Sequence, residues 1–192
     1  MPQGSVLGTL LFNLFINDLP LHITNTKVVC ELFADDNSIH SSGTDAESIQ
    51  CSLQEGLNDV SKWCHENSIV FHPGKTKSMV LASRQKHQRK PIMPKLTLGA
   101  NLIDQVCEHG VLGVTLNEEL KWQSHIDTVC KKLARNLFLH GQLKHYLSID
   151  CRKIFFNAHL LAHINYASTL WSNASEVHLN KILTLSTEEQ QS

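Results

Sequence analysis

Residues 28–40 read VVCELFADDNSIH, and this pattern predicts a β-hairpin. The opening VVCEL is mostly β-branched or apolar, which is typical of a strand. Ala34-Asp35-Asp36-Asn37 has the composition of a turn, and Ser38-Ile39-His40 can return as a second strand. The hairpin would therefore carry two adjacent carboxylates at its tip.

Asp35 and Asp36 are the strongest candidates for chemistry in the first half of the chain. Adjacent carboxylates repel each other, so the pair is costly unless water or a cation neutralises it. With Mg²⁺, such a pair can supply oxygen ligands for phosphoryl transfer, in which two ions about 3.5–4 Å apart stabilise the attacking and leaving oxygens. A pair of solvated turn residues is the common alternative.

Helices are expected on both sides of the hairpin. We expect Ser5 to be the N-cap of a helix that carries the apolar residues 7–16 and stops at Asp18-Leu19-Pro20. Residues 45–66 predict an amphipathic helix, because apolar residues recur there at steps of three or four.

A small sheet and then a helical region are expected after residue 66. Strands are predicted at residues 69–71, 78–81, 96–98 and 111–116, with an exposed basic loop over residues 83–94. Beyond a boundary near residues 118–122, helices are predicted at residues 126–143, 154–171 and 173–185. This order predicts an α+β fold.

Charge is distributed unevenly along the chain. The 192 residues have a net charge of −1, yet residues 1–74 hold two basic against nine acidic residues. Between Lys75 and Lys95 there are seven Lys or Arg and no Asp or Glu. An acidic half joined to a basic half fits an enzyme that binds a polyanion and uses metal-binding carboxylates, although solvated surface is an alternative.

Several classes of protein are disfavoured. The six cysteines form no close pair and follow no secretory leader, so a disulfide framework is not expected and a reduced, intracellular protein is. The apolar stretch at residues 6–16 is interrupted by polar residues and too short to span a bilayer, so no membrane partner is expected.

Several ordered motifs together resemble the reverse transcriptase of non-LTR (LINE-type) retrotransposons. They cover most of the chain: Pro2-Gln3-Gly4-Ser5-Val6-Leu7-Gly8, Ile16-Asn17-Asp18-Leu19-Pro20, Phe33-Ala34-Asp35-Asp36, Trp63-Cys64 through Asn67 to Lys75-Thr76-Lys77, Leu112-Gly113-Val114, Leu120-Lys121-Trp122, and Asn165-Tyr166-Ala167-Ser168 with Trp171. An ordered series of this kind is far more specific than any one of its members.

The resemblance implies roles for individual residues. Asp35 and Asp36 would be catalytic and would bind Mg²⁺, and Lys75 would stabilise the leaving pyrophosphate. Contacts with the incoming nucleotide and template are implied for Pro2, Gln3, Gly4, Ser5, Phe33 and Ala34. A hairpin that supports the primer end is implied for Leu112, Gly113 and Val114. For Lys75 the alternative is an ordinary surface lysine, and for residues 112–114 it is a buried strand pair.

The resemblance also implies an architecture and partners. Residues 1–118 would form a partial polymerase palm, made of a helix, the catalytic hairpin, a helix and a small antiparallel sheet. Residues 119–192 would form a helical thumb or connection region that contacts duplex phosphates through its Lys and Arg. An RNA template, a DNA primer and deoxynucleoside triphosphates would be the partners, and the nucleus the compartment.

One departure from the family pattern bears on activity. In the family, the first metal-binding Asp and the fingers precede the Pro-Gln-Gly segment, and this sequence begins at Met1. We therefore expect an N-terminally truncated copy with an incomplete Mg²⁺ site, inactive as an isolated chain. The alternatives are a non-catalytic nucleic-acid-binding remnant of a mobile element, and an open reading frame that folds marginally and has no cellular role.

Overall fold

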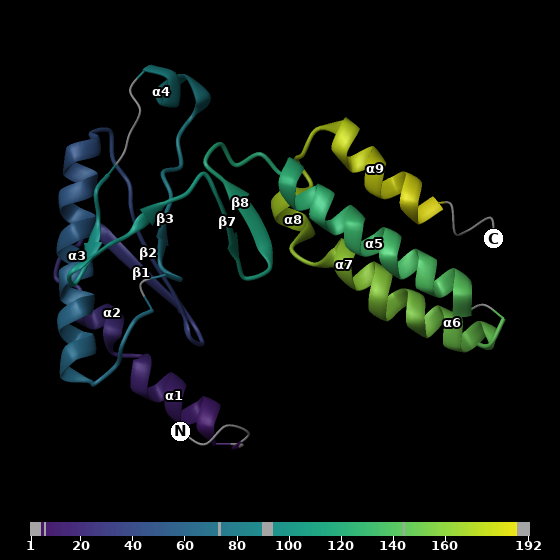
Figure 1. Ribbon diagram of the computed structural model, residues 1–192, viewed down its shortest axis with the longest axis horizontal. Helices are drawn as coiled ribbons and strands as arrows, with labels where there is room; N and C mark the ends of the chain where they lie inside the picture. The colour runs from purple at the N-terminus through teal and green to yellow at the C-terminus, as the bar shows by residue number, and fades with distance from the viewer. Residues whose placement is uncertain (1–4, 6, 73, 90–93, 144, 188–192) are drawn as a thin grey trace. The chain divides into compact units, whose positions relative to one another are not determined.

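The computed structural model describes residues 5, 7–72, 74–89, 94–143 and 145–187, and it forms two compact units (Figure 1). The first unit comprises Met1–Val80 and Arg84–Val106, and the second comprises Leu81–Ser83 and Cys107–Ser192. Helices and short strands occur in both, which confirms the α+β class. The arrangement as palm and thumb, and the division of function at residues 118/119, stay predictions.

The predicted hairpin is present in the first unit. Strand β1 (Val28–Phe33) pairs antiparallel with β2 (Asp36–Ser41), in a register that sets Phe33 opposite Asp36. The loop between the strands is therefore only Ala34-Asp35, and the second strand begins two residues earlier than the turn composition predicted.

The first helix differs from its prediction. Helix α1 (Gly8–Ile16) has Leu7 at the N-cap position, so the expectation that Ser5 is the N-cap was wrong. Ser5 acts through its backbone, because its carbonyl accepts a hydrogen bond from the Gly8 N–H at 3.1 Å. Helix α2 (Leu19–His22) then begins with a proline in its first turn, where the missing N–H has no helical partner to lose.

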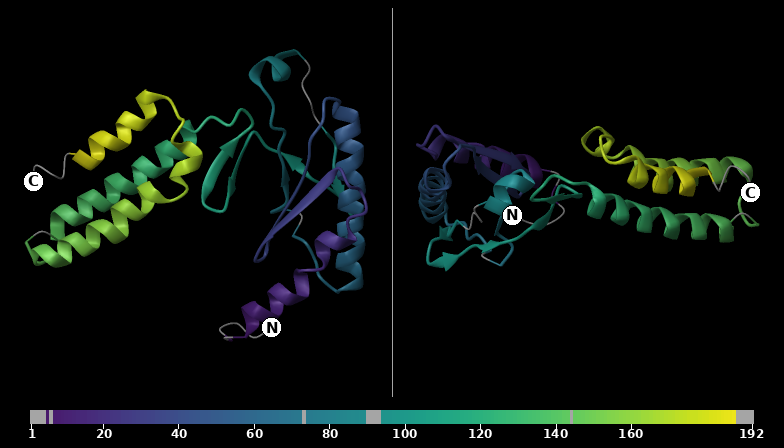
Figure 2. Two further views of the ribbon diagram at one scale, coloured as in Figure 1. Left: turned by 180° about the vertical axis from the view of Figure 1, so that it is seen from behind. Right: turned by 90° about the horizontal axis from the view of Figure 1, so that it is seen from above.

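Helix α3 (Ala46–Glu66) confirms the predicted amphipathic helix and packs on the hairpin (Figure 2). Asp45 caps it by accepting from the Ser48 N–H at 2.8 Å. A Cβ on Gly56 would lie 2.9 Å from Val28 Cγ1, so a glycine is required for this close approach. Trp63, 1% exposed, donates from Nε1 to Asp18 Oδ1 at 3.1 Å and joins α3 to the start of α2.

The remainder of the first unit has little regular structure. Strand β3 (Lys77–Ser78) pairs parallel with β6 (Asp104–Gln105), and β4 (Thr97–Leu98) pairs antiparallel with β5 (Asn101–Leu102). Of the strand expected at residues 78–81, only Ser78 is in a strand, β3. Of the strand expected at residues 96–98, residues 97 and 98 form β4.

Two predictions for this region were wrong. Residues 69–71 are not a strand; Ile69 and Phe71 instead pack into the core beside α3, and Val70 is 91% exposed. The expected loop at 83–94 contains helix α4 (Arg84–Arg89), since Arg, Gln and Lys have good helix propensity even without an apolar face. Residues 90–93 lie outside the described part of the chain.

The second unit begins with another hairpin. Strand β7 (Glu108–Val111) pairs antiparallel with β8 (Val114–Asn117), and Leu112-Gly113 forms the loop. Strand composition alone predicted one strand over residues 111–116, whereas the family resemblance implied the hairpin that is found here.

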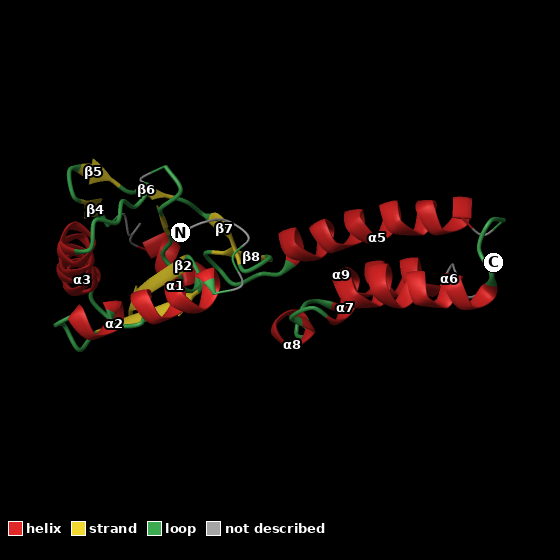
Figure 3. Ribbon diagram, turned by 90° about the horizontal axis from the view of Figure 1, so that it is seen from below, coloured by secondary structure: helices red, strands yellow, loops and turns green. Residues whose placement is uncertain are grey.

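Helices form the rest of the second unit (Figure 3). They are α5 (Gln123–Leu143), α6 (Ile149–Phe156), the π-helical turn η1 (Asn157–Leu161), α7 (Ala162–Asn165), α8 (Ser168–Trp171) and α9 (Glu176–Thr187). Their core contains Ile126, Leu133, Leu160, Trp171 and Ile182. In the described residues, no helix combines the length and the apolar character that crossing a membrane requires.

The single helix predicted over 154–171 was wrong in detail. Ser148 accepts from the Cys151 N–H at 3.4 Å and starts α6 earlier than predicted. The helix then widens at η1, where Asn136 Nδ2 donates to the His159 carbonyl at 2.8 Å. It ends at Asn165, before Tyr166 in extended backbone and Ala167 with φ of +51°. Hydrophobic periodicity carries no signal for either change, because apolar spacing continues through both.

Candidate functional site

The tip of the β1–β2 hairpin carries the predicted metal-binding carboxylates. One face of the hairpin packs toward α3, with Cys30 Sγ donating to Asn37 Oδ1 at 3.2 Å, and the other face is open. Asp36 lies on the open face beside Phe33, which is 65% exposed, and Asp35 is exposed in the loop. Both carboxylates are therefore accessible to a ligand.

The loop is strained at Ala34. Its φ is +52°, in the left-handed region, where a residue with a Cβ is disfavoured by about 1–2 kcal/mol. Strained backbone of this kind is concentrated at functional sites, where the surrounding structure maintains it. Among the described residues, no ion pair neutralises either Asp35 or Asp36.

The donor set at the tip fits a hard divalent cation in part. Carboxylate oxygens are the ligands that Mg²⁺ prefers, and Mg²⁺ commonly takes one or two of them and fills its other positions with water and substrate phosphate. Asp35 and Asp36 can supply that share. No cluster of three or more His, Cys, Asp or Glu suited to a metal ion occurs within residues 5, 7–72, 74–89, 94–143 and 145–187.

The other predicted residues of the first unit lie elsewhere along the chain. Ser5 precedes α1, and Lys75 is exposed in the loop between α3 and β3, with its N–H donating to the His72 carbonyl at 3.0 Å. No hydrogen bond or ion pair between described residues joins either one to the hairpin tip. Pro2, Gln3 and Gly4 lie outside the described residues.

The predicted primer-supporting residues form the tip of the second hairpin. Leu112 and Gly113 are its loop, with φ of +47° and +78°, and Val114 is 6% exposed at the start of β8. The Tyr166 hydroxyl donates to the Leu112 carbonyl at 2.6 Å, and the Thr115 N–H donates to His125 Nδ1 at 3.3 Å.

Sequence reasoning missed what Tyr166 and His125 contact. The family motif that contains Tyr166 predicts no contact for its side chain, and none of the motifs contains His125. One signal was available for the hairpin itself: Gly113 permits a two-residue loop between Val111 and Val114. No local pattern points from that loop to an aromatic residue more than fifty positions later.

The helical residues expected to contact nucleic acid are partly accessible. Lys131, Lys132 and Arg135 are exposed on α5. Asp127 on the same helix pairs with Lys181 of α9 at 2.7 Å, and the hydrogen bond from Lys181 holds the pKa of the Asp127 carboxyl below its usual value. This ion pair links two helices of the unit, and the cluster on α5 keeps its positive charge toward solvent.

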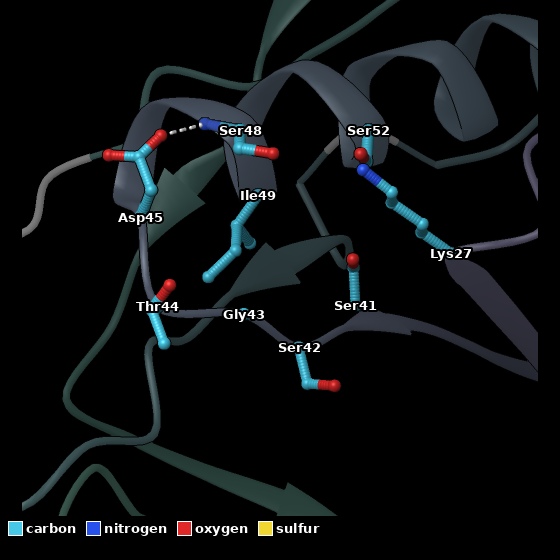
Figure 4. A pocket seen from close by; sticks show the side chains of 9 residues that line it. All are labelled: Lys27, Ser41, Ser42, Gly43, Thr44, Asp45, Ser48, Ile49 and Ser52. Atoms are coloured by element: carbon cyan, nitrogen blue, oxygen red, sulfur yellow. Dashed lines mark hydrogen bonds between the residues drawn. The ribbon is translucent and has the colours of Figure 1, made fainter.

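A cavity of about 230 Å³ lies at the opposite end of the first hairpin (Figure 4). It is lined by the end of β2, the start of α3 and Lys27. Its lining residue Ser41 pairs with Val28 at the start of β1, so the cavity lies away from the hairpin tip at residues 34–35. Of the predicted site residues that the structure describes, none lines it.

Comparisons with known proteins address the family. The family model described as reverse transcriptase (RNA-dependent DNA polymerase) matches residues 1–116. The chain is 27% identical over 194 residues to "RNA-directed DNA polymerase from mobile element jockey" of Drosophila melanogaster, an alignment that covers 96% of this chain and 20% of the relative. It is 26% identical over 194 residues to "Probable RNA-directed DNA polymerase from transposon BS" of the same organism, covering 96% of this chain and 21% of the relative.

A third relative covers a larger share of its own length. "Retrovirus-related Pol polyprotein from type-1 retrotransposable element R1 2" of Nasonia vitripennis is 24% identical over 177 residues, or 88% of this chain and 42% of that protein. The chain thus spans about a fifth of the first curated relatives that it matches. No solved structure matches it significantly. The predicted resemblance is confirmed: the chain belongs to the reverse transcriptase family, and over most of its length it is similar to the RNA-directed DNA polymerases of non-LTR retrotransposons.

Proposed function

We propose that this chain provides the metal-binding hairpin and the primer-side helices of an RNA-directed DNA polymerase, which extends a DNA primer on an RNA template with deoxynucleoside triphosphates. The observation that carries the proposal is the hairpin at residues 28–41, with Asp35 and Asp36 exposed at its tip in a chain of this family.

Asp35 and Asp36 are the proposed ligands of Mg²⁺. Bound there, Mg²⁺ would stabilise the charge that develops on phosphoryl oxygens during nucleotidyl transfer. Phe33, on the open face beside Asp36, and Ala34, in the loop, border the place where the incoming nucleotide would lie. Pro2, Gln3, Gly4 and Ser5 are proposed to contact the same nucleotide and the template.

Lys75 is the proposed partner of the leaving pyrophosphate. Its ammonium group is exposed, and a positive charge near the leaving oxygen stabilises the negative charge that forms there. The primer end is proposed to rest on Leu112, Gly113 and Val114. Exposed Lys131, Lys132 and Arg135 on α5 would contact duplex phosphates, which predicts binding that weakens as salt rises. We place this action in the nucleus, following the family.

We also propose that the 192 residues by themselves extend no primer. The proposal follows the family pattern, in which an Asp that precedes the Pro-Gln-Gly segment shares the metal ions with the hairpin. It concerns the isolated stretch and not a longer polypeptide that contains it.

Primer extension tests the catalytic assignment. A longer polypeptide, in which these residues follow an upstream segment from a relative, would be assayed on an RNA template with a DNA primer. Replacing Asp35 by Asn removes a charged ligand and should lower incorporation by about 100-fold or more, the size typical of losing a group that stabilises transition-state charge. Equal incorporation by both would exclude Asp35 from the mechanism.

Asp150→Asn is the matched control, because the Asp150 side chain is 91% exposed on α6 and its ion pair with Lys153 is long, at 3.9 Å. It should leave incorporation unchanged. Salt-dependent duplex binding without any incorporation, in a polypeptide that includes the upstream segment, would instead favour a nucleic-acid-binding remnant. A chain that neither binds duplex nor unfolds cooperatively would contradict both.

A further inference from the structure

The loop of the β7–β8 hairpin adopts a conformation that its sequence does not favour. Leu112 and Gly113 both have positive φ, +47° and +78°, which is the pattern of a type I′ turn. That turn favours Asn, Asp or Gly at its first central position, and here the residue is leucine. A leucine in this region persists only where the surrounding structure holds it there.

The side chain of Tyr166 contacts this loop at Leu112. Its hydroxyl donates to the carbonyl of Leu112 at 2.6 Å, across 54 residues of sequence. The ring also lies close to the second loop residue, since a Cβ on Gly113 would be 3.4 Å from Tyr166 Cε1. The tyrosine therefore binds the first loop residue, and its ring lies beside the second.

Tyr166 is itself fixed by the helices. Its carbonyl accepts a hydrogen bond from Trp171 Nε1 at 3.2 Å, and Trp171 is 4% exposed in the helical core. Tyr166 has extended backbone, with ψ +119°, and so ends α7 at Asn165. The next residue, Ala167, has φ +51° and leads the chain into α8. Tyr166 thus projects from a bend between two helices, where its backbone has a fixed direction.

A second contact holds the same hairpin on strand β8. The Thr115 N–H donates to Nδ1 of His125, a residue of α5 that is 3% exposed, and the His125 ring lies 6.2 Å from that of Trp171. His125 Nε2 is buried and has no hydrogen-bond partner among the described residues, so the strand amide is the polar contact of this side chain. Tyr166 and His125, which hold the hairpin, are therefore both neighbours of Trp171.

We propose that Tyr166 is a positioning residue that locks the loop of the β7–β8 hairpin to the helices, with His125 as the second anchor, and so fixes where a primer end can rest. The positioning part rests on the proposed function of residues 112–114. The lock itself does not, because it concerns only contacts within the second unit.

Hydrogen exchange on the 192-residue chain without nucleic acid tests the lock. Tyr166→Phe removes only the hydroxyl and should make the backbone amides of residues 111–115 exchange about fivefold faster, the factor that corresponds to one ordinary hydrogen bond. Tyr146→Phe is the matched control, because Tyr146 is the other tyrosine of the chain and is 84% exposed, and it should change nothing there. Equal exchange in Tyr166→Phe and the unmodified chain overturns the lock.

Two further variants keep the test specific. Leu112→Gly relieves the strain in the loop, so adding Tyr166→Phe to it should accelerate exchange less than in the unmodified chain. His125→Asn retains an oxygen near the position of Nδ1, and it should accelerate exchange at Thr115 less than His125→Ala does. Additive effects of Leu112→Gly and Tyr166→Phe would overturn the claim that the hydroxyl maintains the strained loop.

Duplex binding tests the positioning role. The probes are an RNA/DNA duplex with a recessed DNA 3′ end and the same duplex closed by loops at both ends. Tyr166→Phe should reduce the preference for the recessed end by about threefold to fivefold and leave binding of the closed duplex unchanged, whereas general destabilisation would weaken both.

The two proposals fail in distinguishable ways. Faster exchange with an unchanged preference overturns the positioning role of Tyr166. An unmodified chain that binds neither duplex, with faster exchange in Tyr166→Phe, overturns the proposed function and supports the lock.

Discussion

The two hairpins of this chain are held in opposite ways. The β1–β2 hairpin is held along its length by apolar packing on α3, where Gly56 admits Val28, and its tip at residues 34–35 is exposed. The β7–β8 hairpin is held by hydrogen bonds, at its loop by Tyr166 and on β8 by His125. Each has a two-residue loop with a non-glycine residue at positive φ.

This difference fits the chemistry proposed for each loop. Carboxylates that take a metal ion and a nucleotide need open coordination positions, so the hairpin that carries them is anchored away from its tip. A loop that supports a primer end needs a fixed backbone, and side-chain hydrogen bonds to its carbonyl supply that. If packing and hydrogen bonding stabilise the two hairpins independently, a substitution in one unit should leave the hairpin of the other unit unchanged.

The largest effect is expected from the buried tryptophan of the first unit. Trp63→Ala should lower the free energy of unfolding of this unit by about 3–5 kcal/mol, because it leaves a cavity beside Leu19 and Val60 and removes the hydrogen bond to Asp18. Hydrogen exchange should then accelerate in β1, β2 and α3. Trp171→Ala should instead act on β7, β8 and α5, and equal acceleration in both units by either variant would contradict separate anchoring.

A pair of helix glycines gives the next largest effect. Gly56→Ala should destabilise by about 1–3 kcal/mol, because the new Cβ overlaps Val28 Cγ1 and overpacking outweighs the better helix propensity of alanine. Gly141→Ala lies in the equally long α5, where the added Cβ meets no described atom within 4 Å beyond its neighbours and the backbone of its own helix, and it should stabilise by about 0.5–1 kcal/mol. Chemical denaturation of both variants measures this. A stabilising Gly56→Ala would mean that the helix does not rest on β1.

The sequence was sufficient for features that depend on local patterns. The hairpin at residues 28–41 followed from strand composition around a turn, and α3 followed from the apolar periodicity of residues 45–66. The position of Asp35 and Asp36 near the tip followed from the same turn composition, although Asp36 begins β2 instead of lying in the loop.

Several of the failures share a physical cause, which is contact with residues distant in sequence. Residues 69–71 look like a strand, but β-propensity mainly reports packing on a half-buried surface, and there Ile69 and Phe71 pack on α3 without a pairing strand among the described residues. The break at Ala167 and the contacts of Tyr166 and His125 depend on residues distant in sequence, so no local pattern encodes them. The roles of Asp35, Asp36 and Lys75 stay predictions.

A smaller effect is expected at the open tip. Ala34→Gly should stabilise the first unit by about 0.5–1 kcal/mol, because glycine adopts the positive φ without strain. The greater conformational entropy of glycine in the unfolded chain offsets part of this stabilisation. Ala134→Gly, at an exposed position in the interior of α5, should destabilise by a similar amount. Thermal unfolding of the two variants gives the comparison. A destabilising Ala34→Gly would show that the loop is not strained.

The last and smallest effect concerns pH and the second hairpin. Burial, together with the nearby Lys132, lowers the pKa of His125 below its ordinary value of 6.5, and burial with the charges around it lowers the pKa of His163. The unfolded chain therefore binds more protons than the folded chain near and below pH 6.5, so this unit should be most stable above that pH and lose stability as the pH falls. Exchange in β8 and α5 measured between pH 7.5 and 5, extrapolated as free energies of opening, should show this trend.

His125→Asn should weaken that pH dependence, since asparagine does not titrate and can still accept from Thr115. An unchanged slope would assign the effect to His163, whereas stability that rises toward acid pH would contradict a neutral His125 as acceptor. Neutrality matters for the lock because a protonated imidazole donates from both nitrogens and cannot accept the Thr115 N–H. Acid should thus loosen the strand anchored by His125 before it affects the loop held by the Tyr166 hydroxyl.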